Sequence, residues 1–539
     1  MTDLFHTRLG SYQTAINHAV SEIEAQNIIG RIWNHDYTVW QPEPTEITNR
    51  LGWLHLPQTM MDNLVQIQTL VELVKLDGYT HVLLLGMGGS SLAPEVFSKT
   101  FGPNTDGLHL EVLDSTHPDT ILDYANKLDY ARTLFIVSTK SGGTVETQSF
   151  FKYFYNQVAA ELGDEEVGKH FIAITDPGSK LERQANDYNF RQTFLNDPNI
   201  GGRYSVLSYF GLVPAALVGV DIEKLLQRAG EMTGSKGNET GALLGAVLGE
   251  CAKNGRDKLT LITSPQISSF GDWVEQLVAE STGKIGKGIL PVVGEPLGTA
   301  EVYGQDRLFI HLRLAGDDGD VEALNRLAAA GHPVVSIDLT DKYDLGSQFF
   351  LWEMATAVAG YRLGIHPFDQ PNVESAKIRA TSMQDRYQKE GRLPQSTPET
   401  LTAARLNDFL AQARPNAYIA IHAYVQPTAE MDAALQSLRL RLRAQTKFAV
   451  TTGYGPRFLH STGQLHKGDG GNGLFIQFTS DAAEEVPIPE TAGKDDSSIT
   501  FNVLIMAQAL GDGQALKDEK RKVIHFHLGR NPLSALQQI

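Results

Sequence analysis

His81-Val-Leu-Leu-Leu-Gly-Met-Gly-Gly-Ser-Ser91 is the stretch of sequence that decides the class of fold. Its apolar run from Val82 to Leu85 is typical of a strand that is covered on both faces of a parallel sheet. The glycines and serines that follow form a turn with free backbone N–H groups, which suits a sugar or a phosphate, before a helix begins at Leu92. A strand that ends in such a turn predicts an α/β protein whose ligand binds beyond the carboxyl end of the strand.

Short apolar runs separated by helix-like segments recur along the chain. They predict strands at 133–137, 170–174, 259–262, 308–312 and 334–337, and further strands at 418–421, 448–450, 474–478 and 523–527. Strands that alternate with helices are joined by right-handed crossovers and form parallel sheets with helices on both faces. We therefore predict an α/β protein with two three-layer units, mainly parallel sheets, and a smaller C-terminal α/β unit.

Breaks in this pattern indicate how the chain is divided. Prolines within 40–45 end the first segment, a glycine-rich stretch at 234–245 separates the two larger units, and prolines with Ser and Thr at 392–400 precede the last unit. Residues 481–498 are polar and acidic, which predicts a surface loop. The predicted segments are an N-terminal helical approach at 1–55, a first unit at 56–235, a second unit at 236–395 and a C-terminal unit at 396–539.

The composition limits the possible partners. The 539 residues include 63 acidic and 46 basic side chains, a net charge of −17, and no basic stripe, which argues against nucleic acid but allows a small anion at a local site. One cysteine, Cys251, excludes an intrachain disulfide and favours a reducing compartment. No apolar run is long enough to cross a membrane, so we expect a cytoplasmic protein. His525 and His527 would share a strand face without a third ligand, so we predict no metal site.

A second loop, Ser138-Thr-Lys-Ser-Gly-Gly-Thr-Val-Glu-Thr147, follows the strand at 133–137 and concentrates groups that bind phosphate. Hydroxyls, one ammonium, two glycines and a helix N-terminus occur within ten residues. A glycine-rich turn with capping Ser and Thr side chains would explain the hydroxyls but not Lys140. The first loop fits neither a dinucleotide fingerprint nor a P-loop. The predicted substrate contacts are Gly89, Ser90, Ser138, Thr139, Lys140, Ser141 and Thr144.

Five blocks of sequence, in order, resemble the sugar isomerase (SIS) family and, within it, the glucose-6-phosphate isomerases. They are 86–90, 138–147, 201–205 (Gly-Gly-Arg-Tyr-Ser), 276–284 (Gln-Leu-Val-Ala-Glu-Ser-Thr-Gly-Lys) and 368–377 (Phe-Asp-Gln-Pro-Asn-Val-Glu-Ser-Ala-Lys). The segment 453–468 is most similar to the isomerase half of transaldolase/glucose-6-phosphate isomerase fusion proteins, although no transaldolase half is present. The resemblance implies SIS-type units, a homodimer, and a cofactor-free isomerase of glucose 6-phosphate and fructose 6-phosphate that acts by ring opening and an enediolate.

The resemblance also implies roles for individual residues. Glu280 would be the base that shuttles the proton, and its place in an apolar helical stretch favours a site over a solvated face. Arg203, after two glycines, would stabilise the negative charge of the intermediate. Gln276 lies one helical turn before Glu280 and would position the substrate. Gln370 would contact the substrate, and Lys377 would assist at the ring oxygen.

The histidine that opens the sugar ring departs from the family pattern, which places it between the glutamate and the lysine. The context that matches is His460-Ser-Thr-Gly-Gln-Leu-His466, after Lys377 and in the C-terminal unit. We predict His460, with His332 and His466 as alternatives. If His460 has this role, the C-terminal unit must reach the site from the same chain or from a partner subunit.

Two other functions remain open on the sequence alone. One is an isomerase of another aldose phosphate, such as mannose 6-phosphate, because the motifs fix phosphate binding and proton transfer better than hydroxyl configuration. The other is a sugar-phosphate sensor without catalysis. Glu280, Arg203 and Lys377 together argue against the sensor, which would need the phosphate loops but no base.

Overall fold

The first sheet buries a different set of apolar side chains on each face. The computed structural model describes residues 5–102, 107–394 and 397–538, with the side chains of 374–377, 380 and 385 left out. Val82 and Leu84 face one hydrophobic core, whereas Leu83 and Leu85 face another, as the alternation of side chains along a strand requires. All strands of this sheet are parallel. In spatial order they are β3 (His109–Leu113), β2 (His81–Gly86), β4 (Thr133–Ser138), β5 (Phe171–Thr175) and β6 (Gln192–Leu195).

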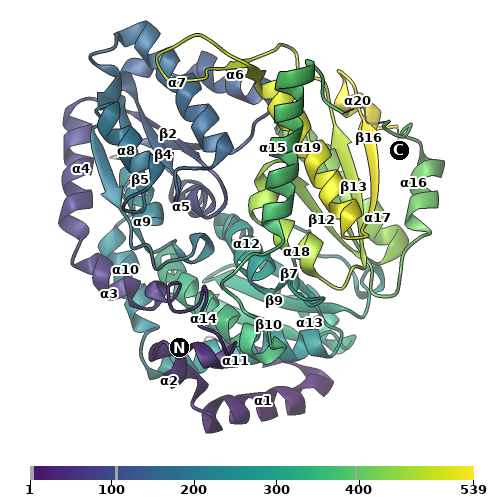
Figure 1. Cartoon of the computed structure of the whole chain (residues 1–539). Coiled ribbons are helices and arrows are strands. Elements are labelled where there is room, and N and C mark those ends of the chain that lie inside the picture. Colours follow the sequence, from purple (N-terminus) through teal and green to yellow (C-terminus); the bar gives the residue numbers. More distant parts are fainter. Residues whose placement is uncertain (1–4, 103–106, 395–396, 539) are drawn as a thin grey trace.

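Helices cover both faces of this sheet and complete the first three-layer unit (Figure 1). They are α3 (Leu56–Met61), α4 (Leu64–Leu76), α5 (Leu92–Phe101), α6 (Pro118–Lys127), α7 (Val145–Leu162), α8 (Lys180–Asp187), α9 (Tyr209–Val218) and α10 (Ile222–Glu231).

The second sheet is parallel except for one edge strand from the N-terminal segment. That strand pairs antiparallel with its neighbour, Phe5 opposite Ile337. The sequence predicted only a helical approach for residues 1–55, and the strand was missed because it has four residues and no apolar run. The strands are β1 (Phe5–Arg8), β10 (Val334–Leu339), β9 (Arg307–Leu314), β7 (Lys258–Thr263) and β8 (Leu290–Val292). The helices are α1 (Gln13–Ala25), α2 (Ile28–Trp33), α11 (Ser235–Lys253), α12 (Phe270–Thr282), α13 (Val321–Ala329), α14 (Leu345–Leu363) and α15 (Val373–Glu390).

The C-terminal unit contains a parallel sheet of four strands. Its strands are β12 (Ala449–Tyr454), β11 (Tyr418–Tyr424), β13 (Gly473–Thr479) and β16 (Lys522–His527). Its helices are α16 (Ala403–Leu410), α17 (Ala429–Thr446), α18 (Gly463–Gly468), α19 (Phe501–Asp518) and α20 (Pro532–Leu536). Helix α15, which follows the second unit, packs along α19 of this unit (Figure 1). None of the described helices has both the length and the apolar character that crossing a bilayer demands.

The predicted surface loop at 481–498 is packed against the first unit. It carries the short strand β14 (Pro487–Ile488), which pairs with β15 (Ile499–Thr500). Val486, Ile488 and Ala492 are buried in the hydrophobic core that α7 shares with one face of the first sheet. The loop is therefore polar along its exposed positions but attaches the C-terminal unit to the first unit.

The glycine-rich stretch at 234–245, predicted to be a separating segment, forms the first half of helix α11. Gly241, Gly245 and Gly249 recur every four residues and form a flat stripe against α14. A Cβ on Gly245 would lie 2.6 Å from the Cβ of Val358 and 2.7 Å from the carbonyl oxygen of Ala355. The glycines are thus required by the close approach of two helices.

Gly245→Ala should lower the free energy of unfolding by about 1–3 kcal/mol, because the added methyl group overlaps the backbone of α14. Gly230→Ala is the matched control, since Gly230 is also helical and a Cβ there meets nothing within 4 Å. The control should be neutral or stabilising by up to about 1 kcal/mol. Thermal unfolding of both variants measures the difference, and equal shifts would show that helix packing is not the cause.

Candidate functional site

The predicted site residues come together where the three units meet, around helix α12 at the centre of the molecule (Figure 1). Five segments contribute, and they follow strands β2, β4, β6, β7 and β12 along the chain. The carboxyl ends of parallel strands are where such loops are expected to form a site. The segments are the turn Gly88–Ser90, the loop 138–144, the turn Gly202–Tyr204, helix α12 and the turn Arg457–His460.

Two glycines allow the first loop to approach neighbouring segments of the chain closely. Gly88 has a φ of +54°, and a Cβ there would lie 2.7 Å from the carbonyl oxygen of His460 and 3.0 Å from Nε2 of Gln276. A Cβ on Gly89 would lie 2.1 Å from the carbonyl oxygen of Gly202. The first loop therefore contacts the turn that carries Arg203 and the turn that carries His460.

Gln276 and Glu280 lie one helical turn apart on the buried face of α12. Gln276 Nε2 donates to Glu280 Oε2 at 3.1 Å and to the carbonyl oxygen of His460 at 2.8 Å. Glu280 is 8% exposed. The amide of Gln276 thus holds the carboxylate of Glu280 and the backbone of the C-terminal unit in one arrangement.

Arg203 is 2% exposed, and each of its three guanidinium nitrogens has an acceptor. Nε donates to Ser281 Oγ at 2.8 Å, and Nη1 lies 2.7 Å from Gln370 Oε1 and 3.2 Å from Glu280 Oε1. Nη2 donates to the carbonyl oxygens of Pro367 and Asp369. This arrangement places Arg203 beside Glu280 and Gln370, as the sequence predicted.

The second loop, 138–144, lies between β4 and the N-terminus of α7. Ser138 Oγ donates to the carbonyl oxygen of Ser90 at 3.2 Å, which joins the two predicted loops. Thr139 and Thr144 pair through their hydroxyls at 3.0 Å, and Ser141 Oγ accepts the N–H of Gly143. The ammonium of Lys140 is paired with Asp176 and with the carbonyl oxygen of Pro198. The hydroxyls and the N–H groups at the start of α7 are therefore the main donors that this loop offers to an anion, because the charge of Lys140 is already paired with Asp176.

His460 lies at the predicted site, 15% exposed at its side chain. Its Nε2 is 3.0 Å from Oε1 of Glu146, in the first turn of α7. Gln508 of the C-terminal unit donates to the same carboxylate oxygen at 2.6 Å and accepts from Thr116 at 2.8 Å. The carboxylate of Glu146 can only accept, so Nε2 of His460 is the donor in this contact and Nδ1 is the other nitrogen of the ring.

The two alternative histidines lie elsewhere. His466 is buried within the C-terminal unit, where its Nδ1 is 3.2 Å from Nε2 of His422. His332 is buried in the second unit beside Arg256, with 3.0 Å between His332 Nδ1 and the guanidinium. Neither has a described contact with Gln276, whose amide binds the backbone of His460, so the geometry favours His460.

Lys377 is on helix α15, but its side chain lies outside the described residues. Three groups that the sequence analysis did not assign also belong to this region: Glu146, Ser281 and Lys284. All three lie inside motifs quoted for the resemblance, so their positions in those motifs were the available signal.

Lys284 holds the chain next to Gln370. Its Nζ donates to the carbonyl oxygen of His366 at 2.6 Å and lies 2.7 Å from Oδ1 of Asp369. Burial and the neighbouring charge of Arg203 lower the pKa of Lys284 to about 7, although Asp369 opposes the shift. Lys284 therefore fixes the segment that supplies two carbonyl acceptors to Arg203.

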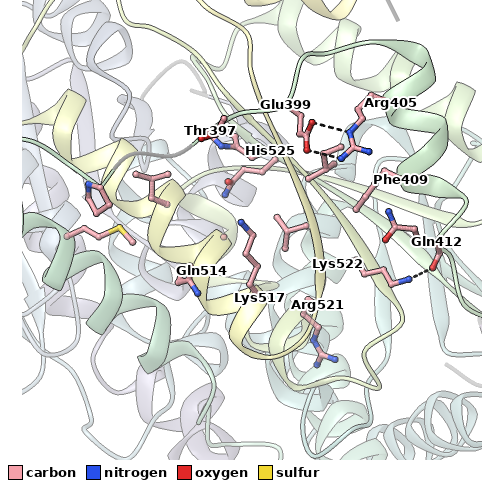
Figure 2. A pocket seen from close by; sticks show the side chains of 17 residues that line it. Thr397, Glu399, Arg405, Phe409, Gln412, Gln514, Lys517, Arg521, Lys522 and His525 are labelled. Atoms are coloured by element: carbon pink, nitrogen blue, oxygen red, sulfur yellow. Dashed lines mark hydrogen bonds and ion pairs between the residues drawn. The ribbon is translucent and has the colours of Figure 1, made fainter.

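A separate cavity of about 560 Å³ lies at the β16 edge of the C-terminal sheet, between α16 and α19 (Figure 2). Arg405 pairs with Glu399 at its rim, and Lys517 extends into it. None of the predicted site residues lines it. Within the described ranges, no group of three or more His, Cys, Asp or Glu side chains is placed to hold a metal ion.

Hydroxyl-rich loops at the carboxyl ends of parallel strands, with a buried carboxylate and arginine beside them, define a phosphosugar-binding α/β protein of the SIS type. A family model described as phosphoglucose isomerase matches residues 69–287. A glucose-6-phosphate isomerase from Rubrobacter xylanophilus is 30% identical over 379 residues, which cover 60% of this chain and 87% of that protein. The chain belongs to the glucose-6-phosphate isomerase family.

Other relatives agree with this assignment. A glucose-6-phosphate isomerase from Parabacteroides distasonis is 26% identical over 397 residues, 63% of this chain and 88% of that protein. The crystal structure of a glucose-6-phosphate isomerase from Chlamydia trachomatis is similar with a TM-score of 0.58 at 16% identity, covering 73% of this chain and 89% of that chain. The predicted fold class is thus confirmed.

Lys284→Met should change how stability depends on pH. An unfolded lysine has a pKa near about 10.4, so between about pH 7 and 10 the folded chain binds fewer protons and its stability rises with pH. Above the unfolded pKa the side chain is neutral in both the folded and the unfolded chain, and its burial costs no charge. As the pH falls through about 7 the buried amine must be protonated, and this part of the stability has been lost. Wild type should therefore gain about 2–4 °C in unfolding temperature over the variant between about pH 7 and pH 9.5. Lys75→Met, on the exposed face of α4, is the control, and parallel pH curves for wild type and Lys284→Met would refute the assignment.

Proposed function

We propose that this protein interconverts glucose 6-phosphate and fructose 6-phosphate, in glycolysis and gluconeogenesis. The observation that carries the proposal is the pair of Glu280 and Arg203, 3.2 Å apart where the predicted loops meet. Relatives named glucose-6-phosphate isomerase support the same substrates. An aldose and a ketose differ by a proton moved between C1 and C2, so the reaction needs a base and a cation beside the developing oxyanion, and no redox cofactor.

In this proposal the loop 138–144 and the start of α7 bind the phosphate group. The N–H groups of a helix N-terminus attract an anion, and the hydroxyls of Ser138, Thr139, Ser141 and Thr144 add donors. Gly89 and Ser90 complete the contact from the neighbouring strand. Because Lys140 is paired with Asp176, backbone and hydroxyl donors supply most of this binding.

Glu280 acts as the base that moves the proton between C1 and C2. Each guanidinium nitrogen of Arg203 already has an acceptor, and a substrate oxygen that binds Arg203 competes with these acceptors. We assign Glu280 as the acceptor that is replaced, because its release provides a free carboxylate next to the sugar carbons. Arg203 then stabilises the enediolate charge, and Gln276 keeps the carboxylate oriented through its 3.1 Å bond.

His460 is assigned to ring opening. With Nε2 in contact with Glu146, Nδ1 is the ring nitrogen that we assign to proton exchange with a sugar hydroxyl or the ring oxygen. Lys377 is assigned to the ring oxygen by its match to the family motif, and Gln370 to substrate contact.

The proposal includes features that rest mainly on the sequence. The net charge of −17 argues against nucleic acid as a partner, and the relatives named glucose-6-phosphate isomerase support a small sugar phosphate. A single cysteine, Cys251, supports a cytoplasmic location. The family resemblance supports a homodimer, and the segment 453–468 supports kinship with the isomerase half of the transaldolase fusions.

Purified protein should convert fructose 6-phosphate to glucose 6-phosphate without added metal or nucleotide. A coupled assay that detects glucose 6-phosphate measures this reaction, with mannose 6-phosphate tested in parallel as an alternative substrate. Binding of fructose 6-phosphate without turnover would refute the enzyme and favour a sensor. Faster turnover of mannose 6-phosphate would instead reassign the sugar specificity.

Glu280→Gln should lower kcat about 10²–10⁴-fold while KM changes little, because the amide keeps the shape of the side chain but cannot accept the proton. Glu72→Gln, on the exposed face of α4, is the control and should leave both constants unchanged. Steady-state kinetics with fructose 6-phosphate separates the two. Near-normal turnover by Glu280→Gln would assign the base elsewhere.

A further inference from the structure

We infer that the cavity at the β16 edge of the C-terminal sheet is a second binding site, which takes a small organic anion with two negative charges on phosphate or carboxylate groups. The cavity has a volume of about 560 Å³ and lies between α16 and α19 (Figure 2). Among the described residues, none that we assign to the isomerase reaction lines it. The inference therefore goes beyond the proposed function and does not depend on it.

The side chains around the cavity carry more positive than negative charge, although the chain as a whole has a net charge of −17. Four cations and one carboxylate are among the residues that line it: Arg405, Lys517, Arg521, Lys522 and Glu399. Burial, and to a smaller extent the charges of His527 and Lys517, lower the pKa of His525 to about 4, so its ring adds no charge at neutral pH. A concave surface with one sign of charge attracts ions of the opposite sign. The cavity therefore attracts an anion.

Two of the four cations are already paired with carboxylates. Arg405 pairs with Glu399 at 2.8 Å, and Arg521 pairs with Asp469 at 3.1 Å. Arg521 also donates to three backbone carbonyl oxygens, which hold it at the cavity wall. These two arginines therefore shape the cavity but leave little charge for a ligand.

Lys517 and Lys522 supply the positive charge that remains. Lys517 belongs to the last turn of α19, and its side chain extends into the cavity (Figure 2). In the part of the chain that the structure describes, its ammonium has no hydrogen bond or ion pair. Lys522 begins β16 and donates to the backbone carbonyl oxygen of Gln412, which is a neutral acceptor. Two uncompensated ammonium groups favour a ligand with two negative charges, because hydrogen bonds between oppositely charged groups are the strong ones.

The walls and the size of the cavity favour an organic ligand over a bare inorganic ion. Phe409 and Ile524 are buried side chains of the C-terminal hydrophobic core that line the cavity, together with Leu510 of α19. A volume of about 560 Å³ lies in the range of about 300–1,000 Å³ that is typical of sites for organic molecules. Such sites combine apolar walls with a few charged or polar groups. We therefore expect a ligand with an apolar part as well as its two charges.

The position of the cavity follows from the topology of the sheet. Strand β16 is an outer strand, and β13 is the strand that pairs with it. The segment before α16 meets this edge at Glu399, whose N–H donates to the carbonyl oxygen of His525 at 2.8 Å, near the end of β16. The beginning of β16 instead lines the cavity. Lysines at an open sheet edge also prevent pairing with another chain, so a test has to separate a binding site from edge protection.

Calorimetric titration of the full chain with inorganic pyrophosphate and, separately, with citrate tests the site. Fructose 6-phosphate is kept at saturation, so that the proposed active site is not available to either probe. At least one probe should bind once per chain, and Lys517→Ala should weaken that binding at least about tenfold. Lys494→Ala removes an exposed lysine from the loop 481–498 of the same unit and should leave the affinity unchanged. The probe that binds more tightly shows whether the site prefers phosphate or carboxylate groups.

Three results would overturn the inference. If neither probe binds saturably, the lysines only protect the sheet edge. If Lys517→Ala and Lys494→Ala lose affinity equally, the attraction is not specific to the cavity. If fructose 6-phosphate releases a bound probe, the probe occupies the proposed active site instead.

The variants themselves provide the remaining controls. Lys517 is exposed, so Lys517→Ala should keep the wild-type unfolding temperature when no probe is present. Lys517→Arg keeps the positive charge and should retain most of the affinity, whereas its complete loss would also contradict the assignment. A protein that lacks isomerase activity but binds a probe through Lys517 would refute the proposed function and support this site, so the two failures are distinguishable.

Discussion

The buried guanidinium of Arg203 is the constraint on which the arrangement of the site depends. A charge that is 2% exposed is tolerated only when its hydrogen bonds are satisfied, and removal of one partner of a buried charge costs about 3–5 kcal/mol. Its acceptors come from α12 and from the segment 367–370, while Arg203 itself belongs to the first unit. The two larger units are therefore fixed to each other at the guanidinium that we propose for the reaction.

The central strands of the fold could be predicted from sequence, whereas most edge strands could not. In the first two sheets every strand with neighbours on both sides was predicted, because burial on both faces produces a continuous apolar run. The missed strands β1, β3, β6 and β8 are the outer strands of those sheets. Strands β1, β3 and β6 are partly exposed and lack a continuous apolar run, whereas β8 is buried but has only three residues, one of them a proline. The glycines of α11 were misassigned for a related reason, since the helix they pack against lies about a hundred residues further along the chain.

The site was predictable where one short motif carries both the geometry and the chemistry. The pair Gln276 and Glu280 follows from helical spacing, and the loop 138–144 follows from its hydroxyls and its place before α7. Partners that are distant in sequence could not be derived in this way. Lys140 gave the strongest sign of anion binding, yet Asp176 already neutralises it. The contact of His460 with Glu146 joins residues from different units, and no local pattern specifies it.

In the C-terminal sheet, as in the other two, a loop beyond the carboxyl end of a strand reaches the site, but this loop contacts the other units. In an open parallel sheet the loops beyond the carboxyl ends of the strands are free to bind a ligand. Strands β2 and β4 use these loops for the predicted phosphate contacts, whereas β12 leads into the turn Arg457–His460. Ion pairs of Arg457 and the packing of Phe458 both hold this turn, so its position depends on direction as well as on burial. The proposed role of His460 needs its ring held in one orientation, and the ion pairs of Arg457, three residues earlier in the chain, restrict the turn that carries it.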